Sequence, residues 1–367
     1  MKILHVTQEM FKTSGVATFC KEIAAEQMRA GHEVRALVQG NYDLKFDEGV
    51  KVVVGPSMEV VGGRPDIVHI HGLWAPFSAR AMTWCRQHGI PYVVSPHGCL
   101  MPRVFKKGWL KKHLFWCLAL RKGVEQASLI HCTAEAERQA VARFGFEVPY
   151  VIAPLGVRLP TPPPSQPSPP SQPSSPSQPS SPSQPHTCLF LGRISDEKGL
   201  PLLLDAWKRL DAADWRLVIA GPDWRGYRAL LEKKVAEEGI RGVEFHDPVF
   251  GPDKDALYRN ADLFALASPV ENFSAVVLDA LAFGVPVICT KGTPWSCIER
   301  EKCGWWVEPN SSAALCEALK VAVALPRDEL AAMGERGIEI ARRDFNWTTI
   351  SNALLAGYES IVGGGES

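Results

Sequence analysis

Short apolar runs alternate with amphipathic helical patterns along most of the chain. The runs are rich in Val, Ile, Leu and Phe, and the segments between them place apolar residues three or four positions apart. Such alternation predicts parallel sheets with helices on both faces. The predicted strands are Ile3–Thr7, Glu33–Val38, Val50–Gly55, Ile67–His71, Tyr92–Ser95, Leu129–Thr133, Tyr150–Ala153, Thr187–Leu191, Trp215–Ala220, Val243–His246, Leu263–Ala267, Val285–Thr290 and Gly304–Val307.

One segment interrupts this alternation. Residues 160–185 consist only of Pro, Ser, Gln and Thr, so they have nothing to bury and favour an extended polyproline II linker. We therefore predict two Rossmann-like, doubly wound α/β domains, residues 1–159 and 186–344. Because such sheets bind ligands at the carboxyl ends of their strands, we expect the two domains to face each other across a cleft that holds the site.

The composition is typical of a globular protein. The chain is 46% hydrophobic and 22% charged, and its apolar runs are shorter than the ~20 residues of a membrane span. Met1–Thr7 has the pattern of a buried strand rather than of a secretory signal, so we expect a cytoplasmic protein. The ten cysteines show no zinc or disulfide spacing and are expected to be reduced core thiols.

The net charge of zero conceals an asymmetry between the two halves. Residues 1–159 carry an excess of Lys and Arg, whereas residues 187–367 carry an excess of Asp and Glu. Two facing domains of opposite net charge would attract each other. The alternative is that these charges are solvated surface without a role.

The first candidate site in the second half is a turn that follows the strand ending at Leu191. Arg193 and Lys198 lie in this turn, before a helical pattern. Cleavage of a sugar–diphosphate bond develops negative charge on the diphosphate, and one planar guanidinium with one ammonium could stabilise it without a metal. The alternative is a solvated turn that carries two cations incidentally.

The second candidate site is a polar loop and the helix start that follows it. Glu271 lies in the loop, and the first-turn amides around Phe273 and Ser274 could bond a phosphate or sugar hydroxyls. Asp279 lies inside the helix, so one carboxylate could contact the donor sugar and the other the ribose. Alternatively, Glu271 interacts only with the helix dipole and Asp279 is paired elsewhere.

Two strand ends of the first half also carry candidate residues. His97 and Gly98 follow one strand, where the glycine permits close approach of a ligand and the imidazole of His97 is our candidate catalytic group. His69 and His71 close another strand with a spacing of two, which places both on one sheet face. His71 and Trp74 are candidates for the acceptor side. A structural role is the alternative for each histidine.

Together the two stretches of the second half resemble the donor-binding domain of GT-B glycosyltransferases of family 4. Gly192, Arg193, Lys198 and Gly199 match that family's G-R-x-x-x-x-K-G turn residue for residue. The resemblance implies a two-domain GT-B fold, a nucleotide-sugar donor and retention at the anomeric carbon. It also implies that no metal or other cofactor is required.

The family's E-x-F-G-x-x-x-x-E signature is matched only in part. Glu271 and Phe273 agree, whereas Ser274 replaces the glycine and Asp279 replaces the second glutamate. The resemblance assigns the first acid to the transferred sugar and the second to the ribose. Because Ser274 adds a Cβ near the donor and Asp279 is one methylene shorter, we expect donor choice to differ at these two positions.

The resemblance extends to the first half and to the end of the chain. Gly15 matches a glycine loop that lies beneath the donor diphosphate, with Ser14 in place of a second glycine. His97 matches a histidine that contacts the donor sugar near the reacting carbon. Residues 345–367 fit a terminal helix that crosses back to the first domain. The chain has no G-x-G-x-x-G, which argues against a nicotinamide or flavin enzyme.

A basic and aromatic segment predicts peripheral attachment to the inner face of the membrane. Its cations would face anionic headgroups and its rings would lie at the interface. The alternatives are a solvated helix whose aromatic residues belong to the core, and a nucleic-acid patch, which lacks any recognisable module. The residues of this patch are Arg103, Lys106, Lys107, Trp109, Lys111, Lys112 and Trp116.

These patterns predict a glycosyltransferase that moves a sugar from a UDP- or GDP-sugar to a hydroxyl of a glycan or lipid-linked glycan. Its place would be in polysaccharide or glycolipid biosynthesis. Two alternatives stay open: a nucleotide-sugar epimerase of the same fold, which needs no acceptor, and a non-catalytic protein that binds a nucleotide sugar or a glycan. Products formed without an acceptor would identify the first, and donor binding without turnover the second.

Overall fold

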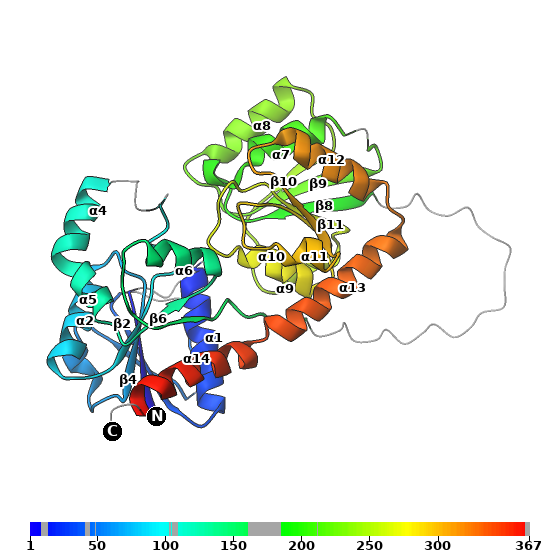
Figure 1. Cartoon of the computed structure of the whole chain (residues 1–367). Coiled ribbons are helices and arrows are strands. Elements are labelled where there is room, and N and C mark those ends of the chain that lie inside the picture. The colour runs from blue at the N-terminus through cyan, green and yellow to red at the C-terminus, as the bar shows by residue number, and fades with distance from the viewer. Residues whose placement is uncertain are drawn as a thin grey trace, which may run out of the picture. The chain divides into compact units, whose positions relative to one another are not determined.

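The computed structural model describes residues 1–8, 14–40, 45–47, 49–102, 104, 109–160, 185–210 and 212–363. The chain divides into two compact units, shown in Figure 1. Unit 1 comprises Met1–Val157 together with Asp344–Ser367, and unit 2 comprises Arg158–Arg343. Apart from its two end residues, the predicted linker 160–185 lies outside the described residues.

Unit 1 contains a seven-stranded sheet in the order β3-β2-β1-β4-β5-β6-β7. The strand pairs that join its neighbours are all parallel. The strands are β1 (Lys2–Thr7), β2 (Glu33–Val38), β3 (Lys51–Val54), β4 (Ile67–His71), β5 (Tyr92–Ser95), β6 (Leu129–Cys132) and β7 (Tyr150–Ile152). The helices are α1 (Gly15–Arg29), η1 (Met58–Val61), α2 (Pro76–Gln87), α4 (Trp109–Phe115), η2 (Trp116–Leu120), α5 (Arg121–Glu125), α6 (Glu135–Ala142) and α14 (Trp347–Val362).

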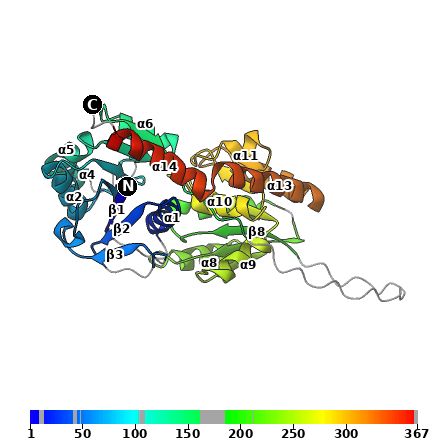
Figure 2. The ribbon, with the colours of Figure 1, turned by 90° about the horizontal axis from the view of Figure 1, so that it is seen from below.

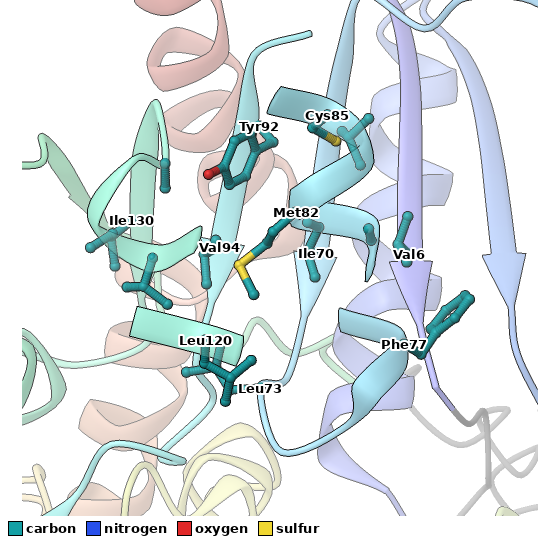
Figure 3. Close-up of a cluster of buried hydrophobic side chains, with 14 of the residues drawn as sticks. Val6, Ile70, Leu73, Phe77, Met82, Cys85, Tyr92, Val94, Leu120 and Ile130 are labelled. Atoms are coloured by element: carbon teal, nitrogen blue, oxygen red, sulfur yellow. The ribbon is translucent and has the colours of Figure 1, made fainter. Parts of the chain in front are cut away.

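Alternate residues of the central strands of unit 1 point to opposite faces of the sheet. Val6, Ile70, Val94 and Ile130 belong to the core cluster on the face covered by α2. Figure 3 shows Met82 of α2 pointing into this cluster. Burial of large apolar side chains on this face holds the helix to the sheet.

The opposite face of the sheet carries a second core cluster. Ile3, Ile67 and Leu129 contribute from three strands, and Phe19 of α1 and Tyr358 of α14 contribute from the covering helices. Helix α14 therefore belongs to unit 1, although it follows unit 2 in the sequence.

The segment that leaves unit 1 and the segment that returns to it lie side by side. Val157 pairs with Asn346 in an isolated parallel bridge, and its amide donates to the carbonyl of Phe345 at 2.7 Å. A Cβ on Gly156 would lie 2.5 Å from the ring of Trp347, so only glycine fits at this crossing. The side chain of Asn346 then caps α14 by accepting from the amide of Thr349 at 2.8 Å.

Unit 2 contains a six-stranded sheet in the order β10-β9-β8-β11-β12-β13, again with parallel pairs. The strands are β8 (His186–Leu191), β9 (Trp215–Ala220), β10 (Val243–His246), β11 (Leu263–Leu266), β12 (Val287–Thr290) and β13 (Gly304–Val307). The helices are η3 (Asp196–Lys198), α7 (Leu200–Lys208), α8 (Tyr227–Glu237), α9 (Pro252–Arg259), α10 (Ala275–Ala282), α11 (Cys297–Arg300), α12 (Ser312–Val323) and α13 (Arg327–Asp344). Figure 2 shows α8 and α10 on opposite sides of β8.

The strands confirm the predicted fold class. Every predicted strand is present, and each of its ends lies within two residues of the predicted position. In both sheets the strand order reverses beside the first strand of the unit, between β1 and β4 in unit 1 and between β8 and β11 in unit 2. These reversals are the switch points at which doubly wound sheets bind ligands.

Two further expectations concern the cysteines and the membrane. None of the ten cysteines, all of which the structure describes, forms a disulfide, and most are buried, but Cys117 is exposed rather than in the core. Among the described residues, no helix is both long enough and apolar enough to cross a membrane.

At the switch point of unit 2, the backbone segments that follow β8 and β11 lie very close together. Gly199 caps α7 with φ of 66°, and a Cβ at this position would lie 2.1 Å from the carbonyl oxygen of Ala267. Gly226 caps α8 with a similar φ of 77°, but a Cβ there would meet nothing within 4 Å. The two glycines therefore share a backbone conformation and differ in the space around them.

We expect Gly199→Ala to destabilise the protein far more than Gly226→Ala. Both substitutions cost about 1 kcal/mol because alanine disfavours positive φ. Gly199→Ala additionally forces two backbone segments apart, which adds at least about 2 kcal/mol. Urea denaturation of the full chain, followed by tryptophan fluorescence, measures both changes. Equal losses in the two variants would contradict the close approach.

Candidate functional site

The switch point of unit 2 brings the two predicted motifs together. The Gly192–Gly199 turn follows β8, and the loop with Glu271 follows β11, the strand that pairs with β8. The ammonium of Lys198 lies 2.5 Å from Oε1 of Glu271. Two residues that the sequence separates by 73 positions therefore form one ion pair at the carboxyl edge of the sheet.

This ion pair is largely buried. The side chains of Lys198 and Glu271 are 19% and 15% exposed. Loss of either partner would leave the other charge poorly solvated and uncompensated. An anion that enters this edge of the sheet can take over Lys198 and release the carboxylate of Glu271 for other hydrogen bonds.

Arg193, the second predicted cation, is exposed in the same turn. Its guanidinium lies 5.1 Å from the centre of the Trp224 ring, which is itself 46% exposed. The cation–π contact orients the planar guanidinium while leaving its edges at the surface. One cation is thus paired with a carboxylate and the other is supported by an aromatic ring.

The start of α10 has an unusual backbone. Ser274 is the N-cap of this helix, and it adopts φ of 67°, in the left-handed region that favours glycine. Phe273 before it is buried, and its carbonyl accepts from the indole of Trp295 at 2.5 Å. Within the described residues, the buried hydroxyl oxygens of Ser268 and Ser274 have no hydrogen-bond partner. Such groups are candidates to bond a ligand.

Asp279 lies inside α10 and has a protein partner. Its Oδ2 accepts from the ammonium of Lys254 on α9 at 2.7 Å. The side chain of Asp279 is 21% exposed, so the carboxylate is reachable but already neutralised. Asp279 is therefore paired with another residue, which was the alternative that the sequence left open. Its contact with a ribose stays a prediction.

In unit 1, Gly15 is the first residue of α1, and Ser14 caps this helix by accepting from the amide of Ala17 at 3.3 Å. A Cβ on Gly15 would meet no atom of the described residues within 4 Å. The amino end of a 15-residue helix favours negative charge.

His97 follows β5 and is held in a strained conformation. Its φ is 49°, in the left-handed region, and its ring is partly exposed. The buried carboxylate of Glu137 fixes the loop, because it accepts from the amide of Gly98 and from the amide and hydroxyl of Thr133. Burial lowers the pKa of His97 to about 3, so the imidazole is neutral at physiological pH.

His71, a candidate for the acceptor side, lies in a cluster of histidines in unit 1. It is buried, with its Nδ1 3.1 Å from Nε2 of His97 and its Nε2 3.0 Å from Nδ1 of His5. Both ring nitrogens of His71 are thus bonded to other imidazoles, as its alternative structural role would require, and its place on the acceptor side stays a prediction. Trp74 is half-buried, and its indole donates to the carbonyl of Cys99 at 3.1 Å.

Two members of this histidine cluster, His5 and His131, escaped the sequence analysis. The available signal was the repetition of a spacing of two at neighbouring strand ends. β1 ends with two polar residues two positions apart, His5 and Thr7, and β4 ends in the same way with His69 and His71. His131 of β6 faces the same side of the sheet. Polar residues at alternate positions of adjacent buried strands indicate a shared polar layer rather than isolated histidines.

The predicted membrane patch is wrong in one respect. Trp116 is buried, with its ring 4.7 Å from that of Phe144, because the turn of η2 points it into the core. The surface of this segment instead carries three leucines four positions apart, Leu110, Leu114 and Leu118, which are 66%, 60% and 78% exposed. Arg103, Lys106, Lys107 and the side chain of Trp109 lie outside the described residues.

Two family models match the chain. The model described as glycosyl transferases group 1 matches residues 171–340, which include the turn and the loop of unit 2. The model described as a glycosyl transferase 4-like domain matches residues 14–156.

Individual relatives match over nearly the whole length. An uncharacterized glycosyltransferase of Methanocaldococcus jannaschii is 27% identical over 342 residues, covering 85% of this chain and 86% of its own. The GDP-mannose-dependent alpha-(1-6)-phosphatidylinositol dimannoside mannosyltransferase of Mycobacterium tuberculosis is 26% identical over 378 aligned positions, 94% of this chain and 92% of its own. The crystal structure of Anabaena HepE in complex with UDP superposes with a TM-score of 0.76 at 17% identity, covering 98% and 100% of the two chains.

We expect Ser274→Gly to raise the free energy of unfolding by about 1 kcal/mol, because glycine adopts φ of 67° without strain. Ser274→Ala keeps the Cβ and the strain, so it serves as the control and is expected to give no such gain. Urea denaturation measures both variants. A Ser274→Gly variant no more stable than Ser274→Ala would contradict the strain.

Proposed function

Since the chain belongs to the group 1 glycosyltransferases of family 4, which have the GT-B fold and use nucleotide-sugar donors, we propose that it transfers a sugar from a UDP- or GDP-sugar to a hydroxyl of a glycan or lipid-linked glycan. The observation that carries this proposal is the Lys198–Glu271 ion pair at the switch point of unit 2. Relatives support both donors, since one is named for its dependence on GDP-mannose and another was crystallised with UDP.

The proposed reaction begins with an exchange of partners at Lys198. A donor diphosphate competes for the ammonium, and Glu271 is then able to accept hydrogen bonds from hydroxyls of the transferred sugar. Arg193 adds a second positive charge from the same turn. As the bond between the sugar and the diphosphate breaks, these two cations stabilise the growing charge of the leaving nucleotide, so the proposed reaction requires no metal.

The remaining contacts are assigned by chemistry and by position. The amino end of α1 at Gly15 suits a phosphate, and neutral His97 suits a sugar hydroxyl. The amides around Phe273 and Ser274 at the start of α10 suit the donor as well. Lys254 bonds Oδ2 of Asp279, so the proposed ribose contact uses Oδ1. Retention at the anomeric carbon and a role in polysaccharide or glycolipid synthesis are parts of the same proposal.

We expect Lys198→Ala to lower turnover by about 10²- to 10³-fold, the usual cost of removing one group that stabilises transition-state charge. The measurement is nucleotide released from a panel of UDP- and GDP-sugars, with and without glycan acceptors. Lys208→Ala is the matched control, because exposed Lys208 belongs to the same unit and pairs with Glu238. Wild-type turnover in the Lys198→Ala variant would refute the assignment, and sugar conversion without an acceptor would indicate an epimerase.

We further propose that unit 1 attaches to an anionic lipid surface through the leucine stripe Leu110, Leu114 and Leu118. Exposed leucines at a spacing of four form one face of a helical segment and would insert among the acyl chains. Lys111, Arg121 and Lys122 are exposed in the same segment and would meet the headgroups. This surface replaces the buried Trp116 as the apolar part of the patch.

A Leu114→Ser, Leu118→Ser double variant is expected to lose most of its sedimentation with anionic liposomes, because it removes two of the three inserting side chains. Leu230→Ser is the control, since Leu230 is 62% exposed on α8 of unit 2 and outside the stripe. Cosedimentation is measured with phosphatidylglycerol-containing and with neutral vesicles. Equal binding of wild type to both vesicle types would exclude the electrostatic part of the proposal.

A further inference from the structure

A continuous chain of hydrogen bonds runs through the polar layer of unit 1. It connects side chains from β1, β4, β5, β6, α1 and α14, and it ends at a backbone carbonyl. Eight side chains take part, five of them imidazoles. In order along the chain of bonds they are His97, His71, His5, Gln27, Tyr358, His69, Ser95 and His131, followed by the carbonyl of Ala153.

The carbonyl of Ala153 determines the direction of the first links. A carbonyl can only accept, so Nε2 of His131, at 2.7 Å, must carry the proton. Nδ1 of a neutral His131 then accepts from the hydroxyl of Ser95 at 2.5 Å. Because Ser95 has a single hydroxyl proton, its oxygen accepts from Nε2 of His69, which leaves Nδ1 of His69 as an acceptor.

The direction of donation continues through α14 and α1. Nδ1 of His69 accepts the phenol proton of Tyr358 at 2.5 Å, so the oxygen of Tyr358 accepts from the amide nitrogen of Gln27 at 3.4 Å. The amide of Gln27 is thereby oriented with its oxygen toward His5, whose Nε2 donates at 2.7 Å. Nδ1 of His5 then accepts from His71.

The last link reaches the candidate site. Nε2 of His71 donates to His5, so Nδ1 of His71 accepts from Nε2 of His97 at 3.1 Å. Every imidazole in the chain is therefore in the Nε2–H form. The reverse direction would require the carbonyl of Ala153 to donate a proton, which it cannot do.

This direction of donation requires every imidazole to be neutral, and burial keeps them neutral. Burial lowers the pKa of His5 and of His131 to about 4 and that of His97 to about 3. Burial and the neighbouring imidazoles hold the pKa values of His69 and His71 well below the usual 6.5.

We propose that this chain of hydrogen bonds, from His97 to the carbonyl of Ala153, is a relay that fixes His97 in the Nε2–H tautomer. The Nδ1 lone pair of His97 is then presented as an acceptor for a hydroxyl of the sugar substrate. Tyr358 and Gln27 are positioning residues in this scheme, since they transmit the direction from Ala153 without touching a substrate. The hydroxyl contact rests on the proposed function. The tautomer does not, because it follows from the hydrogen bonds of unit 1 alone.

The same cluster contains three groups that could hold a metal ion, and the relay gives them another role. Ligand atoms of His5, Cys20 and His71 all lie within 4.8 Å of one another. In the relay, the lone pair on Nδ1 of His5 is used by the proton of His71. A metal ion would need that lone pair and would break the chain at this link.

The test is the imidazole ¹⁵N spectrum of the full chain labelled with ¹⁵N-histidine, with His97 assigned by loss of its signals in His97→Asn. The relay predicts His97 wholly in the Nε2–H form in wild type. Tyr358→Phe removes the link that orients Gln27, so His5, His71 and His97 should gain a measurable Nδ1–H population. His69 and His131 lie on the side still bonded to Ala153 and should not change.

Two further variants keep the result interpretable. Gln27→Met cuts the relay from α1 and should produce the same change at His97. Ser351→Ala is the matched control, because its hydroxyl oxygen is a buried group on α14 without a hydrogen-bond partner in the described structure, and it should leave all tautomers unchanged. Nδ1–H at His97 in wild type, an unchanged His97 in both relay variants, or a stoichiometric metal by elemental analysis would overturn the relay.

Turnover provides the separate test of the hydroxyl contact. If His97 accepts a substrate hydroxyl, kcat/KM for the sugar donor should fall in Tyr358→Phe as the Nδ1–H fraction of His97 rises, up to about fivefold when one neutral hydrogen bond is fully lost, and remain unchanged in Ser351→Ala. A shifted tautomer with unchanged kcat/KM would retain the relay and reject the contact. Absence of any transferase activity would reject the proposed function and leave the spectroscopic result standing.

Discussion

The parallel sheet, whose strands all end at one edge, is the constraint on which both candidate sites depend. Where the strand order reverses, neighbouring loops diverge and leave room for a ligand. In unit 2 the pairing of β8 with β11 brings Lys198 to Glu271 at this point. In unit 1 the pairing of β1 with β4 brings His5 beside His71. The same topological rule thus concentrates the charged groups of one unit and the imidazoles of the other.

Strain accompanies this arrangement at two residues. His97 follows β5 and Ser274 lies in the loop after β11, and both adopt positive φ without being glycine, as Arg225, Lys302 and Asn310 also do. Such conformations cost of order 1 kcal/mol or more and persist only when the surroundings determine them. The buried carboxylate of Glu137 does so for the His97 loop, and the packing of Phe273 against Trp295 does so for the start of α10.

The polar layer of unit 1 imposes a second constraint, because its side chains need hydrogen-bond partners inside the protein. Four buried imidazoles, those of His5, His69, His71 and His131, lose their hydration, and each must recover hydrogen bonds inside the protein. The strands cannot supply every partner, so Gln27 comes from α1 and Tyr358 from α14. The return of the chain to unit 1 thus completes the hydrogen bonding of the core as well as its apolar packing.

The sequence by itself determined the strands, the two-domain organisation and the residue types at the strand ends, because periodicity and local turn chemistry are properties of short segments. It also identified both members of the Lys198–Glu271 pair, but only a resemblance connected them. It did not single out His5 or His131, and it left the burial of Trp116 and a structural role of His71 as alternatives that it could not decide. Those outcomes depend on which strands become neighbours and on which face of each helix packs against its sheet. Contacts between distant segments are decided by packing and hydrogen-bond satisfaction in three dimensions, and only the tertiary structure contains them.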